Sequence, residues 1–189
     1  LVGIIVHNAD AQVVNNSVQY WHDINVCFGV RTACRKTASP AVPVTTTGIR
    51  IFQSTGSVDL NGISSAQEGQ TPQVYLQHGI STAGVDGVRI RKNDIRLVEY
   101  GMWLETSDNL KVVGNVVVGH YLPQQGAASK RVGPASSAAS GILAASGSGS
   151  LFKGNHVMRN INGMDTWNLT TSATITGNDI DMQLDGTND

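Results

Sequence analysis

Two adjacent stretches of the chain decide its fold. Residues 79–100 read GISTAGVDGVRIRKNDIRLVEY, and residues 101–118 read GMWLETSDNLKVVGNVVV. Each stretch opens with a glycine followed by an apolar residue, and each carries an asparagine 14 residues later, Asn93 and Asn115. Apolar side chains stand three residues before and two residues after each asparagine. This spacing of 22 residues predicts a structural repeat.

The same pattern recurs along the chain. Its glycines are Gly3, Gly48, Gly79, Gly101, Gly141 and Gly163, and its asparagines are Asn16, Asn61, Asn93, Asn115, Asn155 and Asn178. All twelve apolar flanking positions are filled in a chain that is only 40% hydrophobic. A degenerate seventh copy, with aspartate in place of glycine, fits residues 23–26. We expect each asparagine to mark a turn of left-handed backbone and the stacked turns to align into an asparagine ladder.

Each copy alternates apolar and polar residues in two or three short runs, which is the period of a β-strand. Such a unit is too small to bury a core alone, so neighbouring copies are expected to stack at about 4.8 Å per strand. The pattern resembles the right-handed parallel β-helix of the pectin-lyase-like superfamily over nearly the whole chain. The resemblance implies an all-β solenoid of about seven coils, which makes residues 1–189 a single domain.

The composition agrees with strands and excludes other classes. Val and Ile together number 34, whereas Glu numbers 3, which argues against a helical protein. A net charge of −1 makes nucleic acid an unexpected partner. The apolar run at residues 116–118 is far too short for membrane insertion. Two cysteines, Cys27 and Cys34, are too few for a disulfide scaffold.

Two insertions interrupt the repeat, near residues 64–73 and 120–140. Both fall between a turn asparagine and the next glycine, so we expect both to protrude from one edge of the solenoid. The chain begins at Leu1 without a readable leader, and neither end shows a helical cap. We therefore expect a fragment of a longer β-helix, or a solenoid whose ends are covered by partner domains.

The first strand of each coil is expected to point its second and fourth residues after the glycine toward solvent. This outer face would carry three aromatic residues, Phe52, Trp103 and Trp167, together with Arg50. Aromatic rings stack on the apolar faces of sugars, and an extended polysaccharide matches a long shallow surface. The aromatic residues are therefore candidates for substrate binding, and the alternative is a subunit interface, where aromatic residues are also enriched.

Carboxylates on the same face are candidates for catalysis, because glycoside hydrolysis uses two of them. Glu105 and Asp165 are the first choice, at about 10 Å along the axis but at different positions along their strands. Asp86 and Asp108 are the second choice, since they occupy matching turns of neighbouring coils at an expected spacing of about 5 Å. That pair also suits two ligands of Ca²⁺, although a recurring structural turn explains it better.

Basic side chains gather on the second strand of the repeat, where Arg89 and Lys111 should be stacked neighbours with Arg91 and Lys153 on the same face. The resemblance implies a tailspike-like segment that binds and cleaves a surface polysaccharide, is a homotrimer, and is located on a virion tail or outside the cell. A secreted polysaccharide lyase or epimerase is the first alternative, and a non-catalytic adhesin or structural shaft is the second. No cofactor is expected, and Ca²⁺ would be required only by a lyase; no metal-ligand spacing is visible.

Overall fold

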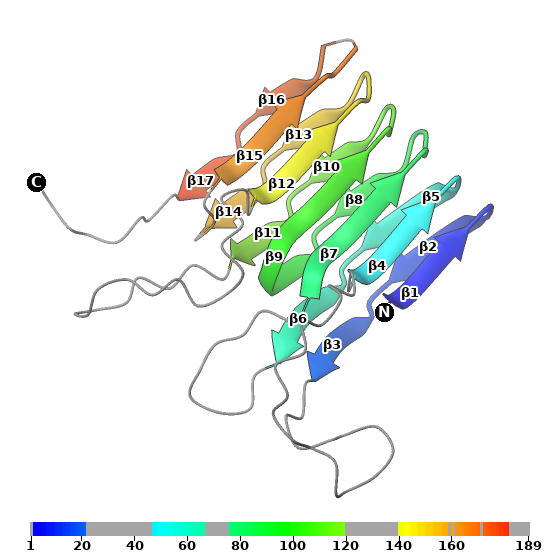
Figure 1. Cartoon of the computed structure of the whole chain (residues 1–189). Coiled ribbons are helices and arrows are strands. Elements are labelled where there is room, and N and C mark those ends of the chain that lie inside the picture. The colour runs from blue at the N-terminus through cyan, green and yellow to red at the C-terminus, as the bar shows by residue number, and fades with distance from the viewer. Residues whose placement is uncertain are drawn as a thin grey trace, which may run out of the picture.

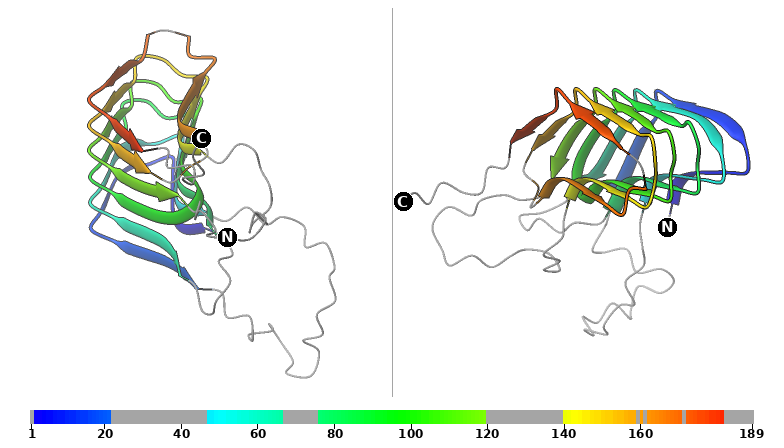
Figure 2. Two further views of the ribbon diagram at one scale, coloured as in Figure 1. Left: turned by 90° about the vertical axis from the view of Figure 1, so that its left-hand side faces the viewer. Right: turned by 90° about the horizontal axis from the view of Figure 1, so that it is seen from above.

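The chain folds into stacked coils of three short strands each. The computed structural model describes residues 2–21, 47–66, 76–119, 140–158, 160, 162–170 and 172–181, which form seventeen strands and no helix. Figure 1 shows the strands of successive coils lying side by side along one axis, and Figure 2 shows the three-sided outline of the stack. The all-β solenoid predicted from the repeat is confirmed.

Three parallel sheets form the sides of this solenoid. The first sheet consists of β1 (Val2–His7), β4 (Thr47–Phe52), β7 (Leu76–Ala83), the second half of β9 (Asp94–Glu105), β12 (Ser140–Ala145) and β15 (Asn162–Trp167). The second sheet consists of β2 (Asp10–Val14), β5 (Thr55–Asp59), β8 (Arg89–Arg91), β10 (Lys111–Val113), β13 (Leu151–Lys153) and β16 (Thr174–Thr176). The third sheet consists of β3 (Ser17–Trp21), β6 (Gly62–Ala66), the first half of β9, β11 (Val116–Gly119), β14 (His156–Met158) and β17 (Asp179–Asp181).

The described residues make six coils, each pairing with the next. The seventh copy at residues 23–26, with Cys27 and Cys34, lies outside the described residues. Both insertions connect the third sheet to the first, as predicted, because they separate β6 from β7 and β11 from β12. Residues 64–66 belong to β6 and residue 140 begins β12, and the rest of both insertions lies outside the described residues.

Inward-facing apolar side chains stack into columns that form the core. Fully buried members of these columns are Ile49, Ile51, Ile80, Met102, Leu104, Ile142, Val58, Ile90, Val112, Phe152, Ile63, Ile95, Val117 and Val157. The register pairs Ile90 with Val112 and Val112 with Phe152, as the repeat predicts. The two end coils of the described stack depart from this burial: Ile4 and Val18 of the first coil are only partly buried, and Ile175 and Ile180 of the last coil are 49% and 42% exposed.

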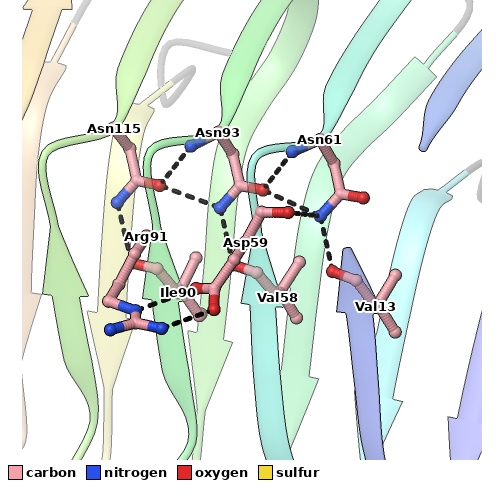
Figure 3. Close-up of polar contacts among 8 residues, drawn as sticks. All are labelled: Val13, Val58, Asp59, Asn61, Ile90, Arg91, Asn93 and Asn115. Carbon is pink, nitrogen blue, oxygen red and sulfur yellow. Dashed lines mark hydrogen bonds and ion pairs between the residues drawn. The ribbon is translucent and has the colours of Figure 1, made fainter. Parts of the chain in front are cut away.

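The asparagine ladder is confirmed in atomic detail (Figure 3). Asn93 donates from its backbone N and from Nδ2 to Oδ1 of Asn115, at 3.0 and 2.9 Å. Nδ2 of Asn115 also donates to the carbonyl of Ile90 at 3.0 Å. The same pattern joins each ladder residue to the next coil, from Asn16 to Asn178. The ladder therefore satisfies backbone groups that the turn between the second and third sheets would otherwise bury unpaired.

The left-handed backbone lies one residue before each ladder asparagine, so the prediction that the asparagine itself adopts it was wrong. Asn15, Leu60 and Lys92 have φ values of 58°, 59° and 53°. Glycine fills the same position in the later coils, at Gly114, Gly154 and Gly177. The reason is geometric: the preceding residue makes the corner, and this leaves the amide of the asparagine free to point along the axis toward the next coil.

The repeated glycine is required by close packing between coils. A Cβ added at Gly48 would lie 2.6 Å from Cγ2 of Ile63 and 2.7 Å from the carbonyl oxygen of Gly79. The other glycines of this column, Gly3, Gly79, Gly101 and Gly141, meet an inward side chain of the third sheet and the next glycine carbonyl in the same way. Only glycine allows the chain to pass this corner of the solenoid.

Candidate functional site

The outer surface of the first sheet carries a row of aromatic side chains. We call it the aromatic face and define it by His7, Arg50, Phe52, His78, Tyr100, Trp103, Leu143 and Trp167. The predicted orientation of these strands is confirmed, because residues such as Ile49 and Ile51 are buried while Arg50 between them is exposed. The face therefore brings together the residues that the sequence nominated for binding a substrate.

Rings from the first two coils form one group on this face. The ring of His7 stacks on Phe52 with a centroid separation of 3.9 Å and an interplanar angle of 17°. The guanidinium of Arg50 lies over the same Phe52 ring, with its carbon 5.4 Å from the ring centroid. His7 also forms a hydrogen bond through Nε2 with Gln53 at 3.2 Å. These contacts hold the partly exposed Phe52 ring in one orientation.

A second group of rings lies on the third and fourth coils. Tyr100 and Trp103 meet edge to face at 5.0 Å, and His78 lies 5.5 Å from Tyr100 and 5.2 Å from Trp103. Tyr100 is only 7% exposed. The expectation that Ser81, Leu143 and Ala145 point to open solvent was wrong, since they are 8%, 5% and 6% exposed. Their neighbours on adjoining strands are larger and cover them: Leu143 and Ser81 both lie beside Trp103, and Ala145 lies beside Trp167.

His78 is the titratable group most altered by this packing. Burial removes water from its ring, and the charge of Arg50 acts in the same direction, so the pKa of His78 falls from 6.5 to about 4. The neutral ring is therefore the form that the folded protein accommodates at neutral pH.

Acid is expected to destabilise the protein through His78. Because its pKa is lower in the folded than in the unfolded chain, the unfolded chain binds the extra proton between about pH 6.5 and pH 4. The free energy of unfolding should fall by about 2 kcal/mol across that window, after allowing for partial exposure of the ring. Urea titrations at several pH values should show a flatter profile for His78→Gln in that window. An unchanged profile would contradict this assignment.

The partly exposed rings recur on alternate coils. Phe52, Trp103 and Trp167 belong to the second, fourth and sixth coils, so successive rings are about 10 Å apart along the axis. Trp167 is 50% exposed. Each ring has a charged residue two positions away on its own strand: Arg50 with Phe52, Glu105 with Trp103, and Asp165 with Trp167. The arrangement is a series of separate stacking surfaces, each with a hydrogen-bonding group on the same strand.

The two acids proposed for catalysis are not a close pair in this register. Trp103 pairs with Leu143 and Leu143 with Asp165, so Asp165 lies two strands from Trp103 and is also displaced along the strand from Glu105. Two strand spacings and two residues place the Cα atoms of the acids about 12 Å apart. Glu105 is exposed, and its Oε2 accepts a hydrogen bond from Nε1 of Trp103 at 3.3 Å. A catalytic role for Glu105 and Asp165 stays a prediction.

Asp86 and Asp108 are neighbours, as predicted, and form an isolated parallel bridge between two turns. Their side chains bind adjacent turns. Asn109 donates from Nδ2 to Asp86 at 2.7 Å, and the hydroxyl of Ser148 donates to Asp108. These contacts favour the structural role of the two carboxylates over a catalytic one. Within the described part of the chain, no three His, Cys, Asp or Glu side chains gather as a metal site.

Sequence reasoning missed His78 and Tyr100 as members of the aromatic face. His78 and Tyr100 occupy the position just before the repeated glycine, and the register pairs them with each other. Strict alternation would point that position inward, like Ile80 and Met102 two residues later, so the periodicity could not have identified it. His7 was on the predicted outer face, but only its stacking on Phe52 gives it a role.

Comparison with known proteins agrees with this architecture. A model of the family described as right-handed beta helix region matches residues 2–180. A search of curated proteins and a search of solved structures each found no match. The described residues contain no helix long and apolar enough to cross a membrane. The matched region covers almost the whole chain and coincides with the three parallel sheets, so this chain belongs to the right-handed β-helix family.

Proposed function

We propose that the aromatic face binds a glycan that lies along the axis of the solenoid. The observation that carries the proposal is the placement of Phe52, Trp103 and Trp167 on alternate coils of one face. Flat rings stack on the apolar faces of sugar rings, and a linear polymer can meet several such rings in turn. Arg50, Glu105 and Asp165 lie on the same strands as the rings, two positions from each, where they can hydrogen-bond to sugar hydroxyls.

The charged residues argue against the use of this face as a subunit interface. The buried centre of an interface is depleted of charged residues, whereas here every ring has a charged residue two positions away on its own strand. The resemblance noted from the sequence extends the proposal to a tailspike-like homotrimer on a virion tail or outside the cell. A secreted lyase or epimerase and a non-catalytic adhesin are the alternatives.

Polysaccharide binding should depend on the exposed rings. A polysaccharide array should first identify a ligand, and calorimetry should then measure its affinity for Trp103→Ala and Trp167→Ala. Each variant is expected to weaken binding by about tenfold, because each removes one stacking surface. Leu60→Ala is the matched control, since Leu60 is 54% exposed but lies in the turn between the second and third sheets. Unchanged affinity in both tryptophan variants would contradict the proposal.

A more specific proposal is that the protein cleaves the bound glycan, and Glu105 is the residue to test for this activity. Glu105→Gln keeps the shape of the side chain and removes its charge. If Glu105 is the acid or base, turnover should fall by at least about a hundredfold while glycan affinity stays within a few-fold. Product analysis on the identified ligand measures this. Full activity in Glu105→Gln would reject the assignment, and the absence of turnover in the wild type would favour a binding protein.

A further inference from the structure

A second charged surface lies on the second sheet, apart from the aromatic face. We call it the basic face and define it by Arg89, Arg91, Lys111 and Lys153, all of them exposed. Their strands β8, β10 and β13 belong to three consecutive coils and lie side by side (Figure 1). Four positive charges therefore gather within three coils of a chain whose net charge is −1.

The four cations surround one partly buried apolar residue, Val113. The register places Arg91 beside Val113 on one side and Lys153 beside it on the other. Lys111 precedes Val113 by two residues on the same face, and Arg89 is the neighbour of Lys111. All four charged side chains thus start within one or two strand spacings of the same point, about 5–10 Å away.

Within the part of the chain that the structure describes, Arg91 is the one cation of the four that forms an ion pair with an acid. Arg91 forms a two-point ion pair with Asp59, in which Nη2 and Oδ2 are 2.6 Å apart and Nε and Oδ1 are 3.0 Å apart (Figure 3). Burial alone would raise the pKa of Asp59, but Arg91 outweighs it and holds that pKa below its usual value. Among the described residues, Arg89, Lys111 and Lys153 form no ion pair.

Uncompensated like charges on adjacent strands destabilise a sheet, and a bound anion removes that repulsion. We propose that the basic face binds the sulfate or phosphate ester groups of a polyanionic glycan. Several cations around one point suit an oxyanion of high charge density with several acceptor oxygens better than a single carboxylate. The partly buried side chain of Val113, at the centre of the four cations, carries no acceptor atom that would repel a bound anion.

The remaining outward positions of the second sheet distinguish a glycan from a nucleic acid. They carry small polar, aliphatic or acidic side chains: Asp10, Gln12, Val14, Thr55, Ser57, Asp59, Leu151, Thr174 and Thr176. Proteins that bind single-stranded nucleic acid add aromatic rings on which bases stack, and these described positions have none. The site does not depend on the glycan proposed for the aromatic face.

Dextran sulfate is a direct probe of this site, with neutral dextran, polygalacturonate and duplex DNA as comparisons. Calorimetry at low salt should show that dextran sulfate binds at least about tenfold more tightly than polygalacturonate, and that added salt weakens it. Lys111→Gln and Lys153→Gln should each weaken binding by about three- to tenfold. Arg96→Gln is the matched control, because it removes one positive charge on the third sheet, where Arg96 pairs with Asp94 at 2.7 Å.

Each alternative outcome overturns the proposal in a recognisable way. An equal loss in Arg96→Gln would show that only net charge matters. Tighter binding of DNA than of dextran sulfate would indicate a nucleic-acid site. Loss of binding in Trp167→Ala, but not in the lysine variants, would assign dextran sulfate to the aromatic face. All three substituted basic residues are exposed, so these variants should fold.

Discussion

Replacing Asn115 by alanine should destabilise the β-helix by about 3–5 kcal/mol, as measured by urea denaturation. The side chain of Asn115 is fully buried and takes part in four hydrogen bonds. The substitution leaves the backbone N–H of Asn93 and the carbonyl of Ile90 without these partners inside the protein. Each buried polar group that loses its partner costs about 1–3 kcal/mol.

Asn178→Ala is the control for this experiment. Asn178 makes the same kinds of contact with Asn155 and Phe152 but lies in the last described coil and is only partly buried. Water can replace the lost contacts there, so we expect a loss of about 1 kcal/mol. Equal losses at Asn115 and Asn178 would show that burial of the ladder does not determine its contribution.

Gly101→Ala should be at least as damaging, with a loss of about 3–5 kcal/mol or failure to fold. The new Cβ would meet Cγ1 of Val117 and the carbonyl oxygen of Gly141 at less than 3.0 Å. One of those atoms is backbone in the next coil, so the clash cannot be relieved by a side-chain rotation.

Gly62→Ala provides a matched comparison within the same fold. A Cβ at Gly62 would have no atom within 4 Å, and its φ is not positive. We expect stability to be unchanged or to rise by up to about 1 kcal/mol, because alanine restricts the unfolded chain. Denaturation midpoints of the two variants measure the contrast. A loss in Gly62→Ala as large as in Gly101→Ala would mean that chain flexibility, rather than packing, explains the conserved spacing of the repeat within this chain.

The fold was predictable because stacking makes the same demand in every coil. An inward position such as Val112 must be apolar, a corner such as Gly101 must lack a Cβ, and a turn such as Asn115 must satisfy buried backbone. Repetition makes these demands visible in one sequence. The left-handed residue was misplaced by one position because asparagine is favoured both for that backbone and for local hydrogen bonds, and the spacing alone does not separate the two.

The candidate site was predictable only in part. Alternation along each strand identified the outward face and nominated Phe52, Trp103 and Trp167. It could not show that Leu143 is buried beside Trp103, because the exposure of an outward residue depends on the size of its neighbours one coil away. Residues 103 and 143 are also separated by an insertion, so their proximity follows from the stack and not from the sequence interval.

The asparagine ladder gives the solenoid a direction. Every link runs the same way, with the N–H groups of one coil donating to Oδ1 of the following coil. Amide dipoles aligned head to tail polarise one another, so each link strengthens the next. The two ends of the described stack are consequently unlike: Asn16 presents an acceptor at one end, whereas Asn178 presents a donor at the other. A further coil could continue the ladder only in the same orientation and register, with its own asparagine supplying the donor at one end or the acceptor at the other.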